Sequence, residues 1–448
     1  MDNAVPAPSR ARRRAVAAIC IGNFVEWFDF GVYAVFATII AQQFFPAEDP
    51  LASLLATFAV FGVAYVARPF GAIVFGHFGD RVGRRDVLAV VMVLMALSTA
   101  MIGLTPNYAS IGIAAPVVLA LARALQGFSV GGEWGGAASF LAEHAPPHRR
   151  GAYGGLMMGT LMLGILAGAV CATLLTLFMP ADALASWGWR IPFLLALPLG
   201  AVGLYLRLKL EESPRFREVA ESSHVQQAPL VQALRVHWRA MLRVVGIAVL
   251  VTSGTYLLGF LISYSVQILR YDLITALAVD VAALAACVVM IAVTSQLSDR
   301  YGRVPLLRWS GVALLVLVVP LFLLMGQGPA GLVVGQVLLG AAVGSYAGPI
   351  TAAVTELFPT DVRYSGLSLS YSVATSVFGG TTPLIVTFLL QRTGDPLAPG
   401  WFIMATAAVS VSVAFLWRET ARDALADVSE SPHRAPADRP VAAEGAIG

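Results

Sequence analysis

Six ionisable side chains stand inside long apolar stretches of this sequence, where charge is costly. They are Glu26, Asp29, Arg68, Arg123, Glu133 and Asp280. One such group at the centre of a membrane-spanning helix costs about 2.5 to 3.5 kcal/mol on insertion scales. Each therefore needs a pairing partner or a functional role, and together they are the first candidates for functional residues.

Glu26 and Asp29 are spaced to share one helix face at i and i+3. Glu26 lies about 16 Å into its apolar stretch at 1.5 Å per residue, which is near a membrane midplane. Two carboxylates so close in a low-dielectric site cannot readily both be ionised, so at least one is suited to carry a proton. The alternative is that they form fixed ion pairs between helices. Glu133 is a third candidate for proton coupling.

Arg123 is the first candidate for binding a solute. A guanidinium in an apolar stretch must pair with an acid or with a carboxylate of the solute, which its planar fork fits well. A plain helix-to-helix anchor is the alternative, and Arg68 has the same two options. The aromatic residues Trp27, Tyr33 and Tyr256 either line a cavity, where they could contact a quaternary amine, or serve packing alone.

The composition shows which elements must position these groups. Of the 448 residues 58% are hydrophobic and only 12% are charged, which excludes an ordinary soluble protein. The three cysteines are far apart and the six histidines stand at or beyond the ends of apolar stretches, so neither a metal centre nor a membrane-embedded enzyme is expected. The arginines form no basic face for nucleic acid.

Twelve apolar stretches are long enough to cross a bilayer as helices. They cover roughly 15–40, 54–77, 87–105, 111–143, 152–177, 189–207, 241–268, 274–296, 306–325, 330–357, 363–391 and 399–417. The sequence therefore predicts an all-α integral membrane protein of twelve transmembrane helices. A lipid bilayer is its expected surroundings.

The charges set a direction for these helices. Of the 29 Lys and Arg, 24 fall on the side of the two termini, which places both termini in the cytoplasm by the positive-inside rule. We expect a cytoplasmic segment (1–14), a six-helix half (15–207), a cytoplasmic linker (208–240), a second six-helix half (241–418) and a disordered tail (419–448).

An internal repeat supports the two halves. Gly127, Gly131, Gly135, Glu143, Pro146 and Arg150 return 213 residues later as Gly340, Gly344, Gly348, Glu356, Pro359 and Arg363. Glycine at every fourth position makes a flat stripe for close helix packing. In the repeat Arg123 becomes Gln336 and Glu133 becomes Tyr346, so we expect the second half to offer the solute neutral contacts. Two such halves with a site between them are typical of rocking transporters.

Several strings of residues resemble the major facilitator superfamily and its metabolite:proton symporter family. They are the loop 76–85, Arg123-x2-Gln126-Gly127, the segments 26–30, 131–133 and 187–193, and Glu356-Leu357-Phe358-Pro359. The resemblance implies proton-coupled uptake of a small carboxylate-bearing or zwitterionic metabolite across a bacterial-type inner membrane. The proton is the expected coupling ion, with no cofactor. Export or antiport on the same fold is the alternative, and the solute and the oligomeric state stay open.

The resemblance also implies that two related loops gate the protein. Their residues, together with one acid in a facing helix end, are Asp80, Arg81, Gly83, Arg84, Glu143, Asp299, Arg300, Gly302 and Arg303. We expect Asp80 to cap the positive end of a helix in the other half, and Arg81 and Arg84 to pair with acids such as Glu143. Asp299, Arg300 and Arg303 would repeat this arrangement in the second half. Because Ser295 and Val304 stand where the first loop has Gly76 and Arg85, we expect the second gate to be looser.

Overall fold

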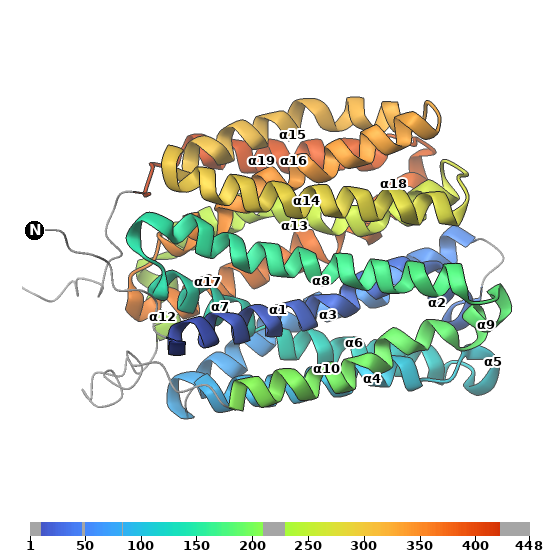
Figure 1. Cartoon of the computed structure of the whole chain (residues 1–448), viewed down its shortest axis with the longest axis horizontal. Coiled ribbons are helices and arrows are strands. Elements are labelled where there is room, and N and C mark those ends of the chain that lie inside the picture. The colour runs from blue at the N-terminus through green and yellow to red at the C-terminus, as the bar shows by residue number, and fades with distance from the viewer. Residues whose placement is uncertain (1–9, 47–49, 83, 209–228, 422–448) are drawn as a thin grey trace, which may run out of the picture.

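The computed structural model describes residues 10–46, 50–82, 84–208 and 229–421. The N-terminal segment before residue 10, most of the predicted linker and the tail from residue 422 lie outside the described residues. We call residues 10–208 the N-terminal half and residues 238–421 the C-terminal half. The terminal end is the end of the bundle at which the described chain begins and ends (Figure 1).

The N-terminal half consists of helices with short interruptions. They are α1 (Arg10–Val35), α2 (Ala37–Phe44), α3 (Pro50–Val82), α4 (Arg84–Leu104), α5 (Tyr108–Ile111), α6 (Ala114–Val130), α7 (Glu133–His144), η1 (Pro147–Arg149), α8 (Arg150–Phe178), α9 (Ala181–Ser186), η2 (Gly188–Arg190) and α10 (Ile191–Leu208). The long helices alternate in direction, so the loops collect at the two ends of the bundle (Figure 1).

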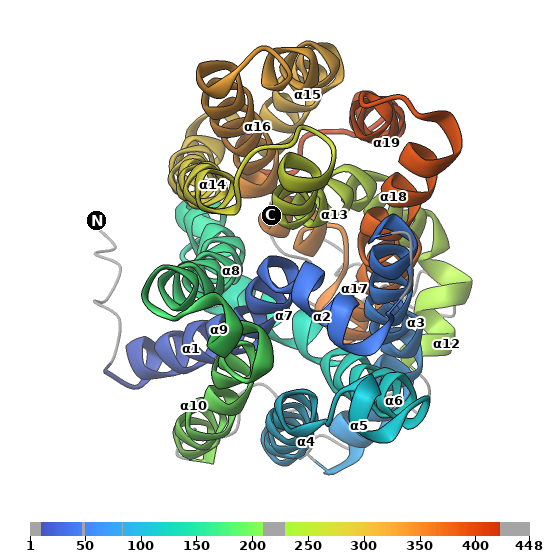
Figure 2. The same ribbon diagram turned by 90° about the vertical axis from the view of Figure 1, so that its right-hand side faces the viewer.

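The C-terminal half follows a short helix, α12 (Pro229–Val236). Its elements are α13 (Trp238–Gln267), α14 (Leu273–Tyr301), α15 (Arg303–Met325), α16 (Pro329–Thr355), α17 (Thr360–Ala374), the π-helical turn η3 (Thr375–Gly379), α18 (Thr382–Thr393) and α19 (Ala398–Phe415). Viewed along the bundle, the two halves form two groups of helices that face each other (Figure 2).

The predicted all-α membrane fold is confirmed. Within the described ranges, ten helical segments are long and apolar enough to span a bilayer, and α1 with α2 forms one further span that is bent by 68°. The apolar part of α4, Ala89–Leu104, is shorter and completes the twelve expected positions. The bend is a feature that the pattern did not predict, because no proline or glycine stands at Val35, Phe36 or Ala37 to mark it.

The glycine stripes pack as the repeat predicts. A Cβ at Gly131 would lie 2.7 Å from the backbone nitrogen of Ala72 in α3, and one at Gly344 would lie 2.9 Å from the Cα of Cys287 in α14. Side chains larger than hydrogen do not fit at these distances, so both helices approach their neighbours backbone to backbone. This contact fixes α6 against α3 and α16 against α14 in the two halves.

Two further interruptions lie near the middle of the bundle. Gly131 and Gly132 separate α6 from α7, which puts Glu133 in the first turn of α7. The π-helical turn η3 separates α17 from α18, and its Ser376 hydroxyl donates to the carbonyl oxygen of Tyr65 in the other half. Such turns are frequent at functional sites.

Candidate functional site

Asp29 and Arg123 form a buried ion pair inside the N-terminal half. Nη1 of Arg123 lies 3.7 Å from Oδ2 of Asp29, and the two residues, Arg123 and Asp29, are 0% and 2% exposed. Gln126, one turn after Arg123, accepts from the guanidinium at 2.5 Å and donates to Asp29, and it also donates to Thr99 of α4 at 2.6 Å. The guanidinium lies 3.8 Å from the ring centroid of Tyr33. A pair held in this way links α1, α4 and α6.

Arg68 occupies a different environment, among aromatic rings at the junction of the halves. Its guanidinium carbon lies 5.4 Å from the Trp27 ring and 4.5 Å from the Tyr65 ring. The ring of Tyr256, from α13, lies 5.0 Å from that of Tyr65. Arg68 is 4% exposed, and among the described residues its Nε and Nη2 have no hydrogen-bond partner. The charge of Glu26 acts on this guanidinium.

A small cavity lies between the halves, next to these rings. It is lined mainly by apolar and aromatic side chains from α1, α3, α8, α13 and α18, namely Phe30, Tyr33, Ala34, Phe58, Phe61, Ile165, Thr255, Tyr256, Gly259, Phe260 and Pro383. Phe61 and Arg68 are two turns apart on α3, so the cavity and the guanidinium share the wall that this helix provides. This is the interface cavity.

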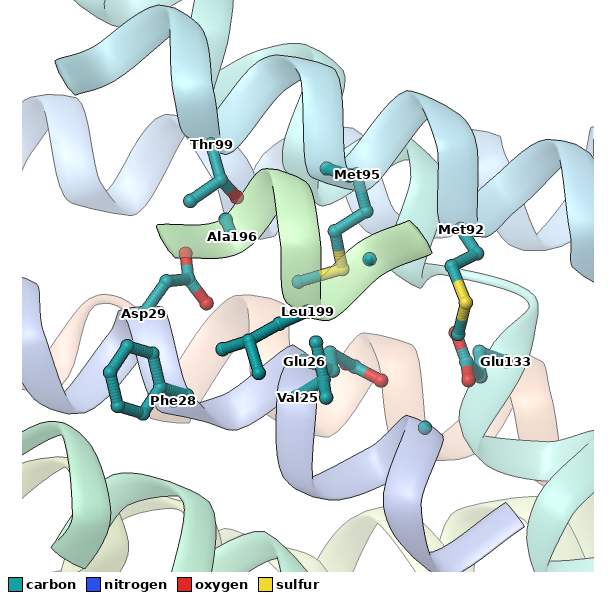
Figure 3. Close-up of a pocket in the computed structure, with 13 residues that line it drawn as sticks. Val25, Glu26, Phe28, Asp29, Met92, Met95, Thr99, Glu133, Ala196 and Leu199 are labelled. Atoms are coloured by element: carbon teal, nitrogen blue, oxygen red, sulfur yellow. The ribbon is translucent and has the colours of Figure 1, made fainter. Parts of the chain in front are cut away.

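A second small cavity lies within the N-terminal half between α1, α4, α7 and α10. Three predicted proton-coupling residues line it together, Glu26, Asp29 and Glu133 (Figure 3). Met92 and Met95 of α4 lie across from them. We call this the acid cavity. The structure thus brings together three carboxylates that come from two separate stretches of the sequence.

The polar residues predicted in the second half have other surroundings. Gln336 donates to the Ser265 hydroxyl at 2.8 Å, and the Tyr346 hydroxyl donates to the carbonyl oxygen of Ile247 at 3.0 Å. Both contacts tie α16 to α13, and neither side chain is among those that line the two cavities. A position near the outer end of its apolar stretch favours solvent exposure of Asp280, but this expectation is wrong, because the residue is 1% exposed.

At the terminal end the halves are joined by crossed ion pairs between the two copies of the repeat. Glu143 pairs with Arg363 at 3.2 Å, and Glu356 pairs with Arg150 at 3.9 Å. The acid of each copy therefore meets the arginine of the other. Arg303 also lies 3.3 Å from Glu356. Burial raises the pKa of Glu356, and the charge of Arg303 opposes the rise, so this carboxylate takes up a proton more readily than an ordinary glutamate.

Asp299 adds a helix cap across the same boundary. Its carboxylate accepts from the backbone N–H groups of Gly151 and Ala152, at 2.7 and 3.0 Å, at the start of α8. Arg303 holds Asp299 at 3.0 Å from within its own half. Gly302 has a φ of 98°, which favours glycine at the turn into α15, whereas Arg300 at the same turn is exposed.

The first of the two predicted gating loops lies at the edge of what the structure describes. Gly83 lies outside the described residues, and the side chains of Asp80, Arg81 and Arg84 are not described either. Their capping and pairing roles stay predictions. For Glu143, the partner that the structure shows is Arg363.

The crossed pairs lead to a charge-reversal prediction. Glu143→Arg brings two guanidinium groups together at the terminal end and is expected to lower transport by about tenfold or more. The double variant Glu143→Arg with Arg363→Glu restores an opposite-charge pair and should recover part of the lost transport. Recovery should be incomplete, because Arg363 also donates to the carbonyl oxygens of Thr355 and Phe358 and these bonds are lost. Initial uptake rates measure both variants. Arg243→Glu, at an exposed position near the same end, is the control, and a double variant no better than the single one would contradict the pairing.

Sequence reasoning did not assign a role to some residues of the site. Gln126 enters it only as part of a family-like string, although its position one helical turn after Arg123 is a signal that could have indicated the shared contact. Tyr65, three residues before Arg68, carries the same signal. The stacking of Trp134 on Tyr371, with centroids 3.6 Å apart and planes at 3°, joins α7 to α17 across the halves, and the sequence holds no sign of it.

The fold is that of a multi-pass membrane protein with two cavities, and the comparisons with known proteins identify its class as a transporter of small solutes. A model of the sugar (and other) transporter family matches residues 15–232 and 217–431. The chain belongs to this family of the major facilitator superfamily, and the resemblance to metabolite:proton symporters is confirmed.

Relatives and solved structures agree with this membership. A proline/betaine transporter of Salmonella typhimurium is 36% identical over 92% of this chain and 85% of its own length. A putative proline/betaine transporter of Staphylococcus aureus is 38% identical over 93% and 91%. The proton:xylose symporter XylE, bound to 6-bromo-6-deoxy-D-glucose, has a TM-score of 0.75 at 16% identity, covering 92% of this chain and 97% of XylE. The likeness to XylE concerns the fold alone.

Proposed function

We propose that the protein takes up a small carboxylate-bearing or zwitterionic metabolite together with protons, by alternating access of the interface cavity. The observation that carries the proposal is the buried guanidinium of Arg68 at the junction of the halves, whose Nε and Nη2 lack a hydrogen-bond partner among the described residues. Two nitrogens of Arg123 lack one as well, but Arg123 is already ion-paired with Asp29. The Arg68 fork is preorganised for a carboxylate. The surrounding rings of Trp27, Tyr65 and Tyr256 suit the alkylated amine of a betaine or the ring of proline, the solutes named for the relatives.

Glu26 provides the coupling in this proposal. Its negative charge acts on Arg68 and so competes with a solute carboxylate for the guanidinium. A proton on Glu26 removes the competing charge, so that proton and solute favour each other's binding. Asp29, in its pair with Arg123, is the second acid of the system. The proton is then the coupling ion, and no cofactor takes part.

We further propose that the protein lies in a bacterial-type inner membrane with the terminal end on the cytoplasmic side, an orientation that the arginine distribution supports. In the described structure that end carries the crossed ion pairs and the Asp299 cap. The arrangement suits a state that is closed toward the cytoplasm. Opening toward the cytoplasm requires these contacts to part, which is the gating role proposed for Glu143, Asp299 and Arg303.

The role of Arg68 is tested by binding. Proline or glycine betaine is expected to raise the apparent melting temperature of the purified protein, because a ligand that binds only the folded state stabilises it. The methyl esters of the same solutes, which lack the carboxylate, should give little shift. Arg68→Gln should weaken binding of the free acids by about tenfold and remove the discrimination. Equal shifts with acids and esters in the unmodified protein would contradict a carboxylate site.

A further inference from the structure

We propose that Asp280 is a proton-binding site of the C-terminal half, where its protonated carboxyl group donates a hydrogen bond to Oε1 of Gln336 and so joins α14 to α16. The ligand of this site is a single proton. The inference goes beyond the proposed uptake, because it involves neither the interface cavity nor the acids of the N-terminal half. It makes the packing of the C-terminal half depend on pH.

α14 and α16 lie side by side and run in the same direction (Figure 2). A Cβ at Gly340 of α16 would lie 3.2 Å from the Cα of Ala283 in α14. One turn further along both helices, a Cβ at Gly344 would lie 2.9 Å from the Cα of Cys287. Because the two helices advance together, the residues one turn before these contacts also face each other.

The residues at that earlier turn are Asp280 and Gln336. Each lies about two turns, or about 10 Å, after the first residue of its helix, at the end of the bundle opposite the terminal end. Asp280 is 1% exposed and Gln336 is 0% exposed. Oδ1 of Asp280 and Oε1 of Gln336 both lack a hydrogen-bond partner in the part of the chain that the structure describes. Both oxygens are acceptors, so a proton on the carboxyl group satisfies the two of them at once.

Ser265 of α13 fixes the orientation of the Gln336 amide. Nε2 of Gln336 donates to the Ser265 hydroxyl at 2.8 Å, which leaves Oε1 for α14. The opposite orientation of the amide would offer Asp280 a donor but would leave a buried negative charge without a cation, which costs more than a missing hydrogen bond. A proton on Asp280 is therefore favoured with either orientation.

No basic side chain lies at the depth of Asp280 on the described elements that pack against α14. These elements are α8, α13, α15, α16 and η1. Their basic residues, with one of α14 itself, all stand at the terminal end, namely His148, Arg149, Arg150, Arg239, Arg243, Arg300, Arg303 and Arg308. Their other titratable groups carry no positive charge and are Tyr153, Cys171, Tyr256, Tyr264 and Tyr346. Arg270, in the turn before α14, is exposed to solvent. Asp280 is thus neutral only if it binds a proton.

The internal repeat shows the same requirement met in a different way. Gln336 stands where the first copy has Arg123, and the guanidinium of Arg123 compensates the carboxylate of Asp29. The second copy has a neutral amide in place of the cation. An acid beside this amide keeps the pair electrically neutral only in its protonated form.

Infrared spectroscopy tests for the proton directly, because a protonated carboxyl group absorbs at a higher frequency than a carboxylate. The difference between the spectra of the unmodified protein and Asp280→Asn, both at neutral pH, should contain a protonated carboxyl band. Asp182→Asn, at an exposed position, is the control and should remove a carboxylate band instead. Loss of a carboxylate band in Asp280→Asn would overturn the proposal.

The bound proton also makes stability depend on pH. In the unfolded chain Asp280 loses its proton above about pH 4, whereas the folded chain keeps it. The unfolded state then binds one proton fewer, so the folding equilibrium constant should fall by about tenfold per pH unit through this group. Asp280→Asn keeps an N–H donor for Gln336 but does not titrate. As the pH is raised from about 5 to about 8, the melting temperature of this variant should rise above that of the unmodified protein.

Equal pH dependence of the two melting temperatures would overturn the proposal. A rise in melting temperature with sodium concentration that Asp280→Asn abolishes would overturn it too, because the site would then hold a metal cation. Should Asp280→Asn fail to fold, Gln336→Leu tests the same contact by removing the acceptor. The protonated carboxyl band should then move to higher frequency, and an unmoved band would contradict the hydrogen bond between the two side chains.

Discussion

Protein carrying Asp29→Asn is expected to exchange its solute across a bilayer without accumulating it against a gradient. The amide is a fixed neutral copy of the protonated acid, so the site no longer gains or loses a proton as the halves rock. If the outward-open and inward-open states no longer differ in proton binding, a pH gradient cannot drive solute accumulation. Glu26→Gln should behave in the same way, because its neutral side chain no longer competes for Arg68.

Two assays in proteoliposomes separate coupling from movement. Accumulation under an imposed pH gradient should fall to the equilibrium distribution in both variants, whereas counterflow of labelled solute should stay measurable. Asp182→Asn, which neutralises an exposed acid at the end of the bundle opposite the terminal end, is the control and should keep full accumulation. Undiminished accumulation in both Asp29→Asn and Glu26→Gln would refute the assignment of the proton to these acids.

Arg123→Leu is expected to have the largest effect on stability. The guanidinium is fully buried, and its removal leaves the Asp29 carboxylate without the cation 3.7 Å away. Breaking a buried ion pair from one side costs about 3 to 5 kcal/mol, because the remaining charge is neither solvated nor paired. The variant also loses the hydrogen bond to Gln126 and the contact with the Tyr33 ring. We therefore expect a lower melting temperature and no transport.

A double variant shows whether the stability loss in Arg123→Leu comes from the broken ion pair or from lost packing. Removing both charges, in Arg123→Leu with Asp29→Asn, should recover much of the melting temperature, since a neutral pair avoids the unpaired buried charge. Accumulation should stay lost, because the proton-binding acid is gone. Thermal unfolding of the purified single and double variants measures the coupling between them. If the double variant is as unstable as Arg123→Leu alone, the cost lies in packing and not in charge.

The membrane spans could be predicted because they depend on local composition. A run of about 20 apolar residues must form a helix in lipid, whatever the rest of the chain does. The breaks within the spans are less predictable. Gly131 and Gly132 mark the break before α7 only weakly, and Gly379 and Gly380 give an equally weak sign of the π-helical turn at Thr375–Gly379, whereas the bend at Phe36 carries no sequence sign.

Part of the site could be predicted from the free-energy cost of placing a charged side chain in an apolar stretch. A charged group in an apolar stretch requires a partner or a function wherever the helix lies in the fold, and this requirement singles out Asp29, Arg68 and Arg123. The same reasoning left open which arginine meets which acid. The structure pairs Arg123 with Asp29 and leaves Arg68 among aromatic rings. That distinction changes the candidate for the solute's carboxylate from Arg123 to Arg68.

By itself the sequence determined the class of molecule: helices that cross a membrane, a repeated motif in each half, and a few charges placed where they are costly. These features depend on residues near one another in the chain, because helix periodicity and transfer to lipid are local properties. Only the tertiary structure decided that Glu143 meets Arg363, that three acids share one cavity, and that Asp280 is buried. Such contacts join residues that are far apart in the chain, and their energies depend on how the helices pack and exclude water.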